Sequence, residues 1–180
     1  MSENTTGKHW FVMRDLRRRS AKVLAIHELA DAGFEVFTPM AEMLLNVNGR
    51  KIRRLLPVIQ DLLFVHSVKE DLDRFVEVKP NLQYRYSHGR SVNEPTIVRH
   101  DEMERFIKAV SSSDAPRYYM PGEISPSMYG RRVRIVGGPL DNYEGCLLSV
   151  RGMRTRRLIV EISGLVSASV EVNPDFIEFV

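Results

Sequence analysis

A segment rich in proline and serine divides the chain and limits what can fold on either side of it. Residues 111–128 contain three serines in succession and three prolines at five-residue spacing. Because proline lacks the backbone N–H that helices and central strands use, neither element is expected within this stretch. We therefore predict a linker over residues 111–128, between a larger domain over residues 8–110 and a smaller one over residues 129–180.

Short apolar runs and one turn signal predict the strands of the larger domain. Residues 10–13 form an apolar and aromatic run typical of a buried strand. Residues 62–65 lack polar alternation, which indicates a strand buried on both faces. The pair Asn48-Gly49 is well suited to a type I′ turn, so the residues on either side, 43–47 and 51–56, are expected to form a hairpin. Further strands are expected over residues 35–38 and 82–86.

Three helices complete the larger domain. Asp15, Ser20 or a neighbour can cap the first helix, and Gly33 can end it because glycine readily adopts a left-handed backbone. The other two helices are expected over residues 71–78 and 101–110, where apolar residues recur at helical spacing. The predicted fold class is α+β, a sheet packed against helices in a sandwich. The apolar stripe of the first helix comprises Val23, Ile26, Leu29 and Ala30.

The tail beyond the linker contains only strand signals. Short apolar runs with glycine turns between them predict a small five-stranded β-barrel. The expected strands are residues 133–136, 145–150, 158–162, 168–172 and 177–180.

The residue types that catalysis or metal binding would need are scattered. The five histidines lack metal-site spacing, and the single cysteine excludes an intramolecular disulfide. No nucleophile, base and oxyanion donor assemble in the sequence, so we expect neither an enzyme nor a cofactor. Without an apolar run of about 18–20 residues or a signal peptide, the chain is expected to be cytoplasmic with no membrane partner.

Basic residues gather in four clusters, although the formal net charge is only +3. A solvated surface explains any one cluster equally well, but four together favour an anionic partner such as nucleic acid. The first cluster is the strongest candidate, since at a strand-to-helix junction its side chains project together. The clusters are Arg14, Arg17, Arg18, Arg19 and Lys22; Arg50, Lys51, Arg53 and Arg54; Arg131, Arg132 and Arg134; and Arg151, Arg154, Arg156 and Arg157.

Residues 133–147 resemble the KOW motif, in which a strand, a Gly-Pro turn and a glycine opening the next strand follow one another. Gly138 and Pro139 form the turn, and Gly145 supplies either a positive φ or a close approach between strands. KOW barrels also occur in ribosomal proteins. A ribosome-associated RNA-binding protein is therefore the alternative function.

The larger domain resembles the N-terminal (NGN) domain of the NusG family of transcription factors. Residues 10–12, 33–39, 57–65 and 81–86 fall on that domain's strands, and the domain order agrees. Gln60-Asp61 replaces the usual Pro-Gly of the signature strand, and Leu62 replaces the usual aromatic residue. With these departures the chain is similar to specialised paralogues, namely the UpxY-type antiterminators and, more distantly, RfaH.

The resemblance implies an elongation and antitermination factor that acts by binding. In this family the N-terminal domain docks an apolar patch on the β′ clamp helices of RNA polymerase, and specialised members also read the non-template DNA strand. The KOW tail recruits a further partner, such as a ribosomal protein or a termination factor. For Phe64 and Leu82, a place in the core is an equally good interpretation. By position, the polymerase-binding patch comprises Ile59, Leu62, Phe64, Leu82 and Tyr84, and the nucleic-acid contact comprises Arg17, Arg18, Arg19 and Lys22.

Overall fold

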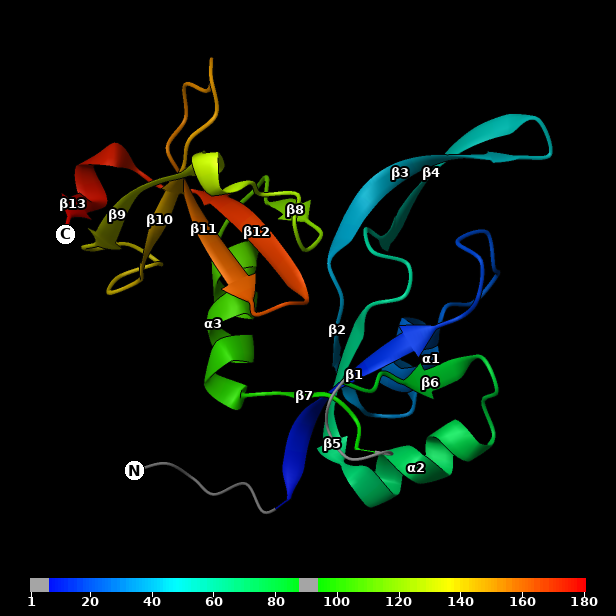
Figure 1. Ribbon diagram of the computed structural model, residues 1–180. Helices are drawn as coiled ribbons and strands as arrows, with labels where there is room; N and C mark the ends of the chain where they lie inside the picture. The colour runs from blue at the N-terminus through cyan, green and yellow to red at the C-terminus, as the bar shows by residue number, and fades with distance from the viewer. Residues whose placement is uncertain (1–6, 88–93) are drawn as a thin grey trace. The chain divides into compact units, whose positions relative to one another are not determined.

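The computed structural model describes residues 7–87 and 94–180 and shows two compact units, Met1–His100 and Asp101–Val180 (Figure 1). Helix α3 (His100–Ser111) lies almost wholly in the second unit, whereas the sequence places residues 101–110 in the larger domain. The apolar spacing of an amphipathic helix predicts which of its faces is buried, but it does not predict which element packs against that face. Because neither unit is shown to fold alone, the predicted domain limits of 8–110 and 129–180 stay a prediction.

The first unit is built on a five-stranded antiparallel sheet. Strand β1 lies between β5 and β6, β2 pairs with the other side of β5, and β7 also pairs with β1. The predicted strands at 10–13, 35–38, 62–65 and 82–86 are therefore confirmed, with small shifts at their ends. The bounds are β1 Lys8–Asp15, β2 Glu35–Phe37, β5 Leu63–Val68, β6 Leu82–Tyr84 and β7 Ile97–Val98.

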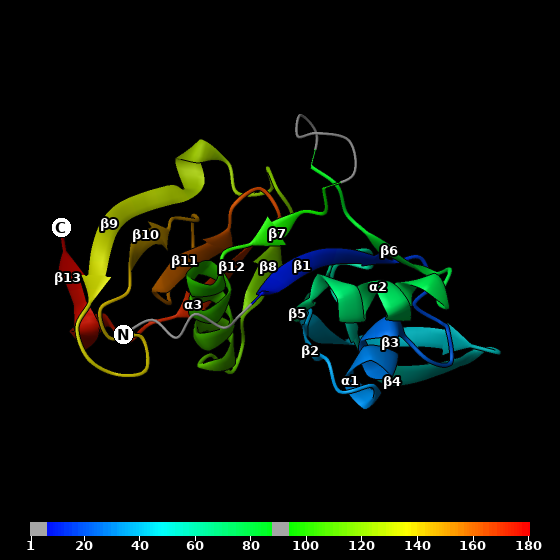
Figure 2. The same cartoon turned by 90° about the horizontal axis from the view of Figure 1, so that it is seen from below.

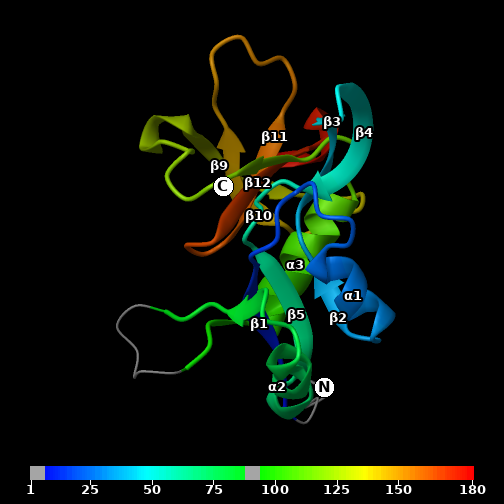
Figure 3. The same cartoon turned by 90° about the vertical axis from the view of Figure 1, so that its right-hand side faces the viewer.

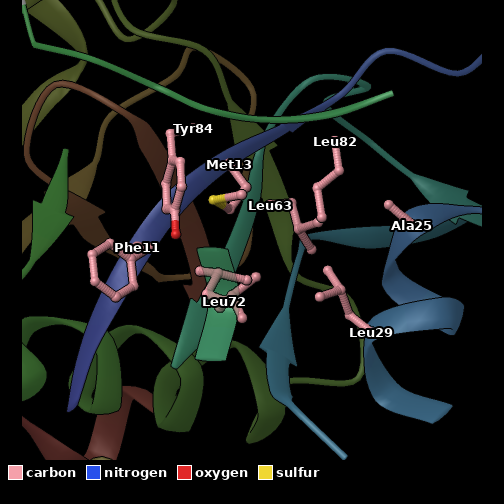
Figure 4. Close-up of a cluster of buried hydrophobic side chains, with 9 residues drawn as sticks. Phe11, Met13, Ala25, Leu29, Leu63, Leu72, Leu82 and Tyr84 are labelled. Atoms are coloured by element: carbon pink, nitrogen blue, oxygen red, sulfur yellow. The ribbon is translucent and has the colours of Figure 1, made fainter. Parts of the chain in front are cut away.

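Two helices, α1 (Ala25–Asp31) and α2 (Lys69–Glu77), pack on one face of this sheet. Figure 4 shows their side chains among those of the strands. Gly33, with φ of 88°, follows α1 and lets the chain turn, as predicted. The core cluster comprises Phe11, Met13, Ala25, Leu29, Leu63, Val65, Leu72, Leu82 and Tyr84.

The predicted apolar stripe of α1 needs correction at two positions. Val23 precedes the helix and is 44% exposed, and Ala30 is also exposed. Ala25 and Leu29 are the buried residues of α1, and Ile26 is partly buried against the same cluster. The difference arises because the helix begins at Ala25, two residues later than the apolar spacing suggests.

The opposite face of the sheet carries large side chains that neither α1 nor α2 contacts. Strand register places Val12 beside Phe64 and Trp10 beside His66, alternating with the residues that point toward the helices. The Trp10 and His66 rings stack with centroids 4.9 Å apart. Since Phe64 and Val65 are both 0% exposed, β5 is buried on both faces, as the sequence predicts.

Strands β3 (Met40–Val47) and β4 (Arg50–Pro57) form a separate two-stranded sheet. Asn48 and Gly49 connect them with φ of 52° and 79°, the positive values that a type I′ turn requires. The predicted hairpin is thus confirmed. Figure 1 shows this ribbon extending away from the five-stranded sheet.

The second unit contains a six-stranded antiparallel sheet in the order β13-β9-β10-β11-β12-β8. Figure 2 shows β9 as a long, curved strand beside β13. The five predicted strands are confirmed, but the end strands β13 and β8 do not pair within the described residues, so a closed barrel stays a prediction. The bounds are β8 Arg117–Tyr119, β9 Tyr129–Ile135, β10 Glu144–Leu148, β11 Arg157–Ile162, β12 Val166–Glu171 and β13 Ile177–Phe179.

Part of the predicted linker is built into the second unit. β8 pairs with β12 at the edge of the sheet, where the prolines that flank it cost no ladder hydrogen bond. Ile124 is 8% exposed and packs in a cluster with Leu148 and Ile159. Apart from Ser111 at the end of α3, this segment has no α-helix and no central strand. The prolines do not prevent an edge strand, core contacts or the short 3-10 helix η1 (Pro126–Met128), which begins at a proline.

Candidate functional site

The junction between β1 and α1 is organised around Asp15, which is 9% exposed. Its Oδ2 accepts a hydrogen bond from the backbone N–H of Ala25, the first residue of α1, at 2.7 Å. Leu24, which immediately precedes the helix, supplies no side-chain cap. Asp15 therefore caps α1 from ten residues away, which confirms its predicted capping role and fixes where the helix begins.

Arg17 is held by the same carboxylate and by α1. Its backbone N and its Nε donate to Asp15 Oδ1 at 3.0 and 3.1 Å, and its Nη2 donates to Glu28 Oε2 at 2.8 Å. Burial alone would lower the pKa of Arg17, but the bonds with Glu28 and Asp15 raise it. With 16% of its side chain exposed, Arg17 braces the junction.

Arg19 is also committed to contacts within the protein. Its Nη2 donates to the backbone oxygen of Val58 at 2.8 Å, and its Nη1 lies 3.7 Å from Met43 Sδ. These contacts connect the junction to β3 and to the residue that follows β4. Its buried Nε has no hydrogen-bond partner among residues 7–87 and 94–180. Arg19 therefore has less freedom to reach a ligand than its place in a basic cluster suggests.

Arg18 and Lys22 differ from these two arginines. Both are exposed, and neither side chain makes a hydrogen bond or an ion pair within the described residues. The structure therefore divides the four predicted nucleic-acid residues into two that hold the junction, Arg17 and Arg19, and two that project into solvent. A count of basic residues cannot distinguish these groups, because the difference depends on acceptors elsewhere in the fold: Asp15 and Glu28 for Arg17, and the carbonyl of Val58 for Arg19.

Leu82 and Tyr84, predicted as part of an exposed polymerase-binding patch, belong to the hydrophobic core. Met13 lies directly opposite Tyr84 on the neighbouring strand, so both point toward α1 and α2. Tyr84 Oη donates to Asp73 Oδ1 at 2.8 Å, and burial, together with this bond, raises the pKa of Tyr84. Strand alternation, which alignment by position does not reveal, explains this burial, and a polymerase contact by Leu82 and Tyr84 remains a prediction.

Ile59, Leu62 and Phe64 are likewise buried, at 7%, 2% and 0% exposure. Phe64 lies on the sheet face opposite the helices, with the Phe37 ring centroid 6.2 Å away. The five predicted residues thus do not form one exposed surface. A polymerase contact by these three remains a prediction.

In the second unit, two of the predicted KOW residues, Gly138 and Pro139, lie in a tight turn, and the third, Gly145, lies on β10. Gly138 has φ of 70°, and a Cβ there would lie 2.9 Å from the Phe176 ring. Gly145 has no positive φ, but a Cβ there would lie 3.0 Å from the carbonyl oxygen of Ile159. Of the two roles open to Gly145, close approach between strands is therefore the observed one. Pro139 lies in the same turn, and Asp141 Oδ1 accepts from the N–H of Gly137 at 2.6 Å.

Helix α3 contacts the segment that follows this turn. The Arg105 guanidinium lies 4.5 Å from the centre of the Tyr143 ring, and its Nη2 donates to the carbonyl of Glu144 at 2.7 Å. Tyr143 Oη donates back to the carbonyl of Arg105 at 3.0 Å. These contacts explain why α3 groups with the second unit. The sequence gives no signal for them.

Within the described residues, no group of three or more His, Cys, Asp or Glu side chains is placed to hold a metal ion. No helix among those residues is long and apolar enough to span a membrane.

Comparison with known proteins identifies a family that matches more than half of the chain. Residues 8–107 match the family described as "Transcription termination factor nusG". The chain is also similar to a solved structure described as "Domain interaction in Thermotoga maritima NusG", with 18% identity, a TM-score of 0.48, and coverage of 95% of this chain and 96% of that chain. No curated protein sequence matches the chain.

Proposed function

The chain belongs to the NusG family of transcription factors, and from this premise we propose that it binds RNA polymerase during elongation and suppresses pausing and termination. The observation that carries the proposal is the family match over residues 8–107, which spans the five-stranded sheet and both helices that pack on it. Antitermination by this mechanism needs no chemical step. A factor that binds the elongating state more tightly than the paused state shifts the equilibrium by that difference in affinity.

The polymerase contact lies on the sheet face opposite α1 and α2. Phe64 and Val12 lie on this face, and Leu62 and Ile59 precede β5. The proposal is supported by the packing of α1 and α2, which both lie against the other face of the sheet. Since Phe64 and Leu62 are at most 2% exposed, docking on the β′ clamp helices requires these side chains to be uncovered first.

The exposed side chains of Arg18 and Lys22 contact the non-template DNA strand. Arg17 and Arg19 position the segment that presents them, through Asp15, Glu28 and Val58. Guanidinium and ammonium groups bind phosphate, which gives affinity without sequence preference. Loss of Arg18 and Lys22 together should weaken binding to single-stranded DNA and reduce its salt dependence by about 1.4 in the log–log slope.

The departures from the usual family sequence just before β5 favour a specialised paralogue over a general elongation factor. Gln60 stands where the family usually has proline, and its Nε2 donates to the carbonyl of Arg17 at 2.9 Å. The unusual residue is therefore tied to the basic junction. The second unit recruits a further partner, such as a ribosomal protein or a termination factor.

Purified RNA polymerase and ribosomal subunits, each tested for capture by the full chain, distinguish the proposal from ribosome association. The wild type should retain polymerase, and Leu62→Asp should lose most of that binding because a carboxylate enters the apolar contact. Val78→Asp is the matched control, since Val78 is 70% exposed and α2 ends immediately before it. Circular dichroism and thermal melting confirm that each variant is folded, and Ile59→Ser is a milder second variant.

Two outcomes contradict the proposal. If Leu62→Asp and Ile59→Ser both retain polymerase, the contact is not on this face. If the wild type captures only ribosomal subunits, the ribosome-associated alternative is correct. A transcription assay with purified polymerase then measures read-through at a terminator, which should rise with the wild type and not with Leu62→Asp.

A further inference from the structure

The β3–β4 hairpin is a free-standing ribbon. Its strands pair with each other over eight residues, from Met40 opposite Pro57 to Val47 opposite Arg50, and with no other strand among the described residues. At about 3.3 Å per residue, the ribbon is roughly 26 Å long. Figures 1 and 3 show it extending away from the five-stranded sheet.

The ribbon carries a net positive charge. Residues 40–57 contain four basic side chains and one carboxylate, Glu42, a surplus of three. The basic residues are Arg50, Lys51, Arg53 and Arg54.

These four side chains are unpaired, unlike Arg17. None of them forms a hydrogen bond or an ion pair within the described residues, and all except the half-buried Arg54 are exposed. Because no carboxylate neutralises them, their field extends into solvent, where it can attract a polyanion.

Both faces of the ribbon combine positive charge with exposed apolar side chains. Strand alternation puts Lys51 and Arg53 on one face with Leu44 and Leu55, which are 63% and 58% exposed. The other face carries Arg50 and Arg54 with Val47 and Ile52, which are 37% and 38% exposed. The ribbon therefore suits a partner that contacts both of its faces.

We propose that this hairpin enters a groove of double-stranded DNA. This inference rests on the proposed function, which places the protein on transcribed DNA. The duplex contact of the hairpin is separate from the contact that Arg18 and Lys22 make with single-stranded DNA. The major groove is about 12 Å wide and admits a two-stranded ribbon. Phosphates line both walls of a groove, so basic side chains on both faces find partners. The exposed Leu44 and Leu55 contact sugars and thymine methyl groups.

Composition favours duplex DNA over other polyanions. Single-stranded nucleic acid is usually held by stacking its bases on aromatic side chains, and residues 40–57 contain no aromatic residue. A membrane surface selects an element with one apolar and one charged face, whereas charge here lies on both faces.

Fluorescence anisotropy of a labelled 30-base-pair duplex, titrated with the full chain at several salt concentrations, tests the proposal. The variant with Arg50, Lys51, Arg53 and Arg54 all changed to Gln should bind at least about tenfold more weakly at 100 mM salt. Its log–log salt slope should be smaller by up to about 3.6, since each lost phosphate contact removes about 0.9. Leu44→Ser with Leu55→Ser should weaken binding about threefold or more with an unchanged slope, because no charge is removed.

The matched control removes four exposed charges elsewhere, with Arg74, Arg151, Arg154 and Arg156 changed to Gln. An equal loss in this control overturns the proposal, since net charge would then explain the binding. Unchanged duplex affinity in the hairpin variant also overturns it, as does a loss seen only with the matching single strand or with phosphatidylserine vesicles. Polymerase capture by the hairpin variant should stay at the wild-type level, so a failure of the duplex contact is distinguishable from a failure of the proposed function.

Discussion

Arg157 belongs to a basic cluster in the sequence, yet its side chain is buried and joins separate segments of the second unit. It is 1% exposed on β11, although it ends a run of basic residues. Its Nε donates to Ser169 Oγ at 2.9 Å, its Nη1 pairs with Glu171 Oε1 at 2.9 Å, and its Nη2 donates to the carbonyls of Ala115 and Ser169, both at 2.6 Å. Burial lowers the pKa of this guanidinium. The side chain thereby connects the segment before β8 to β11 and β12.

Replacement of Arg157 by Leu should lower the free energy of unfolding of the protein by about 2–4 kcal/mol. The carbonyl of Ser169, a residue that is 0% exposed, would lose this donor, and leucine would not compensate for four polar contacts. Urea unfolding followed by circular dichroism measures the change. Arg156→Leu is the control, because Arg156 is the exposed neighbour and its loss should change stability by less than about 0.5 kcal/mol. Equal effects of the two substitutions would contradict the role given to Arg157.

At the scale of the element, α1 depends on a carboxylate outside it. The Asp15 side chain accepts from the first N–H of α1 and from Arg17, so the start of the helix and the conformation of the junction depend on one residue. The helix has seven residues, too few to be stable without such support.

Asp15→Ala should therefore cost about 1–3 kcal/mol, because the helix loses its cap and the partly buried Arg17 loses both of its hydrogen bonds to Asp15. It should also weaken binding to single-stranded DNA, because Arg18 and Lys22 lose the framework that presents them. Asp31→Ala, at the exposed end of α1, is the control for helix charge. Urea unfolding and anisotropy with single-stranded DNA measure the two effects. Wild-type stability in Asp15→Ala would mean that the cap is dispensable.

Elements with a local cause were predictable from the sequence, and those with a distant cause were not. The hairpin follows from Asn48-Gly49 and the end of α1 from Gly33, since each depends on the backbone preference of the turn residues themselves. The start of α1 depends on a carboxylate ten residues away. The burial of Tyr84 depends on which sheet face the helices cover. The placement of α3 depends on the contacts of Arg105 with Tyr143 and Glu144. None of these has a signature within a few residues of sequence.

Across the first unit, ion pairs with carboxylates connect elements that are far apart in sequence. Glu28 on α1 accepts from Arg17 at 2.8 Å and from Lys79, beyond α2, at 3.0 Å. These two hydrogen bonds hold the pKa of Glu28 below its usual 4.5. A folded-state pKa below the unfolded value means that the stabilisation is complete above the unfolded pKa and is lost as the pH falls through the folded one.

The midpoint of urea unfolding should therefore vary little between pH 6 and 8 and decline below about pH 4.5. In Glu28→Gln, stability at pH 7 should be lower and the acid decline shallower, since one contributing carboxylate is absent. The decline should not vanish, because Lys69 and Tyr84 also lower the pKa of Asp73. Glu77→Gln, at the exposed end of α2, should follow the wild type. An acid decline in Glu28→Gln as steep as in the wild type would contradict this account.

Two segments extend from the fold in Figure 3, the β3–β4 ribbon and the loop between β10 and β11. The ribbon is the longer of the two, and its strands pair regularly. Between Leu44 and Leu55 every side chain of the ribbon is at least partly exposed, and only near its base does Leu56 become fully buried. Apart from the Asn48-Gly49 turn, sequence changes in that stretch therefore carry little folding penalty. Natural selection can therefore vary the surface of the ribbon almost independently of the rest of the protein.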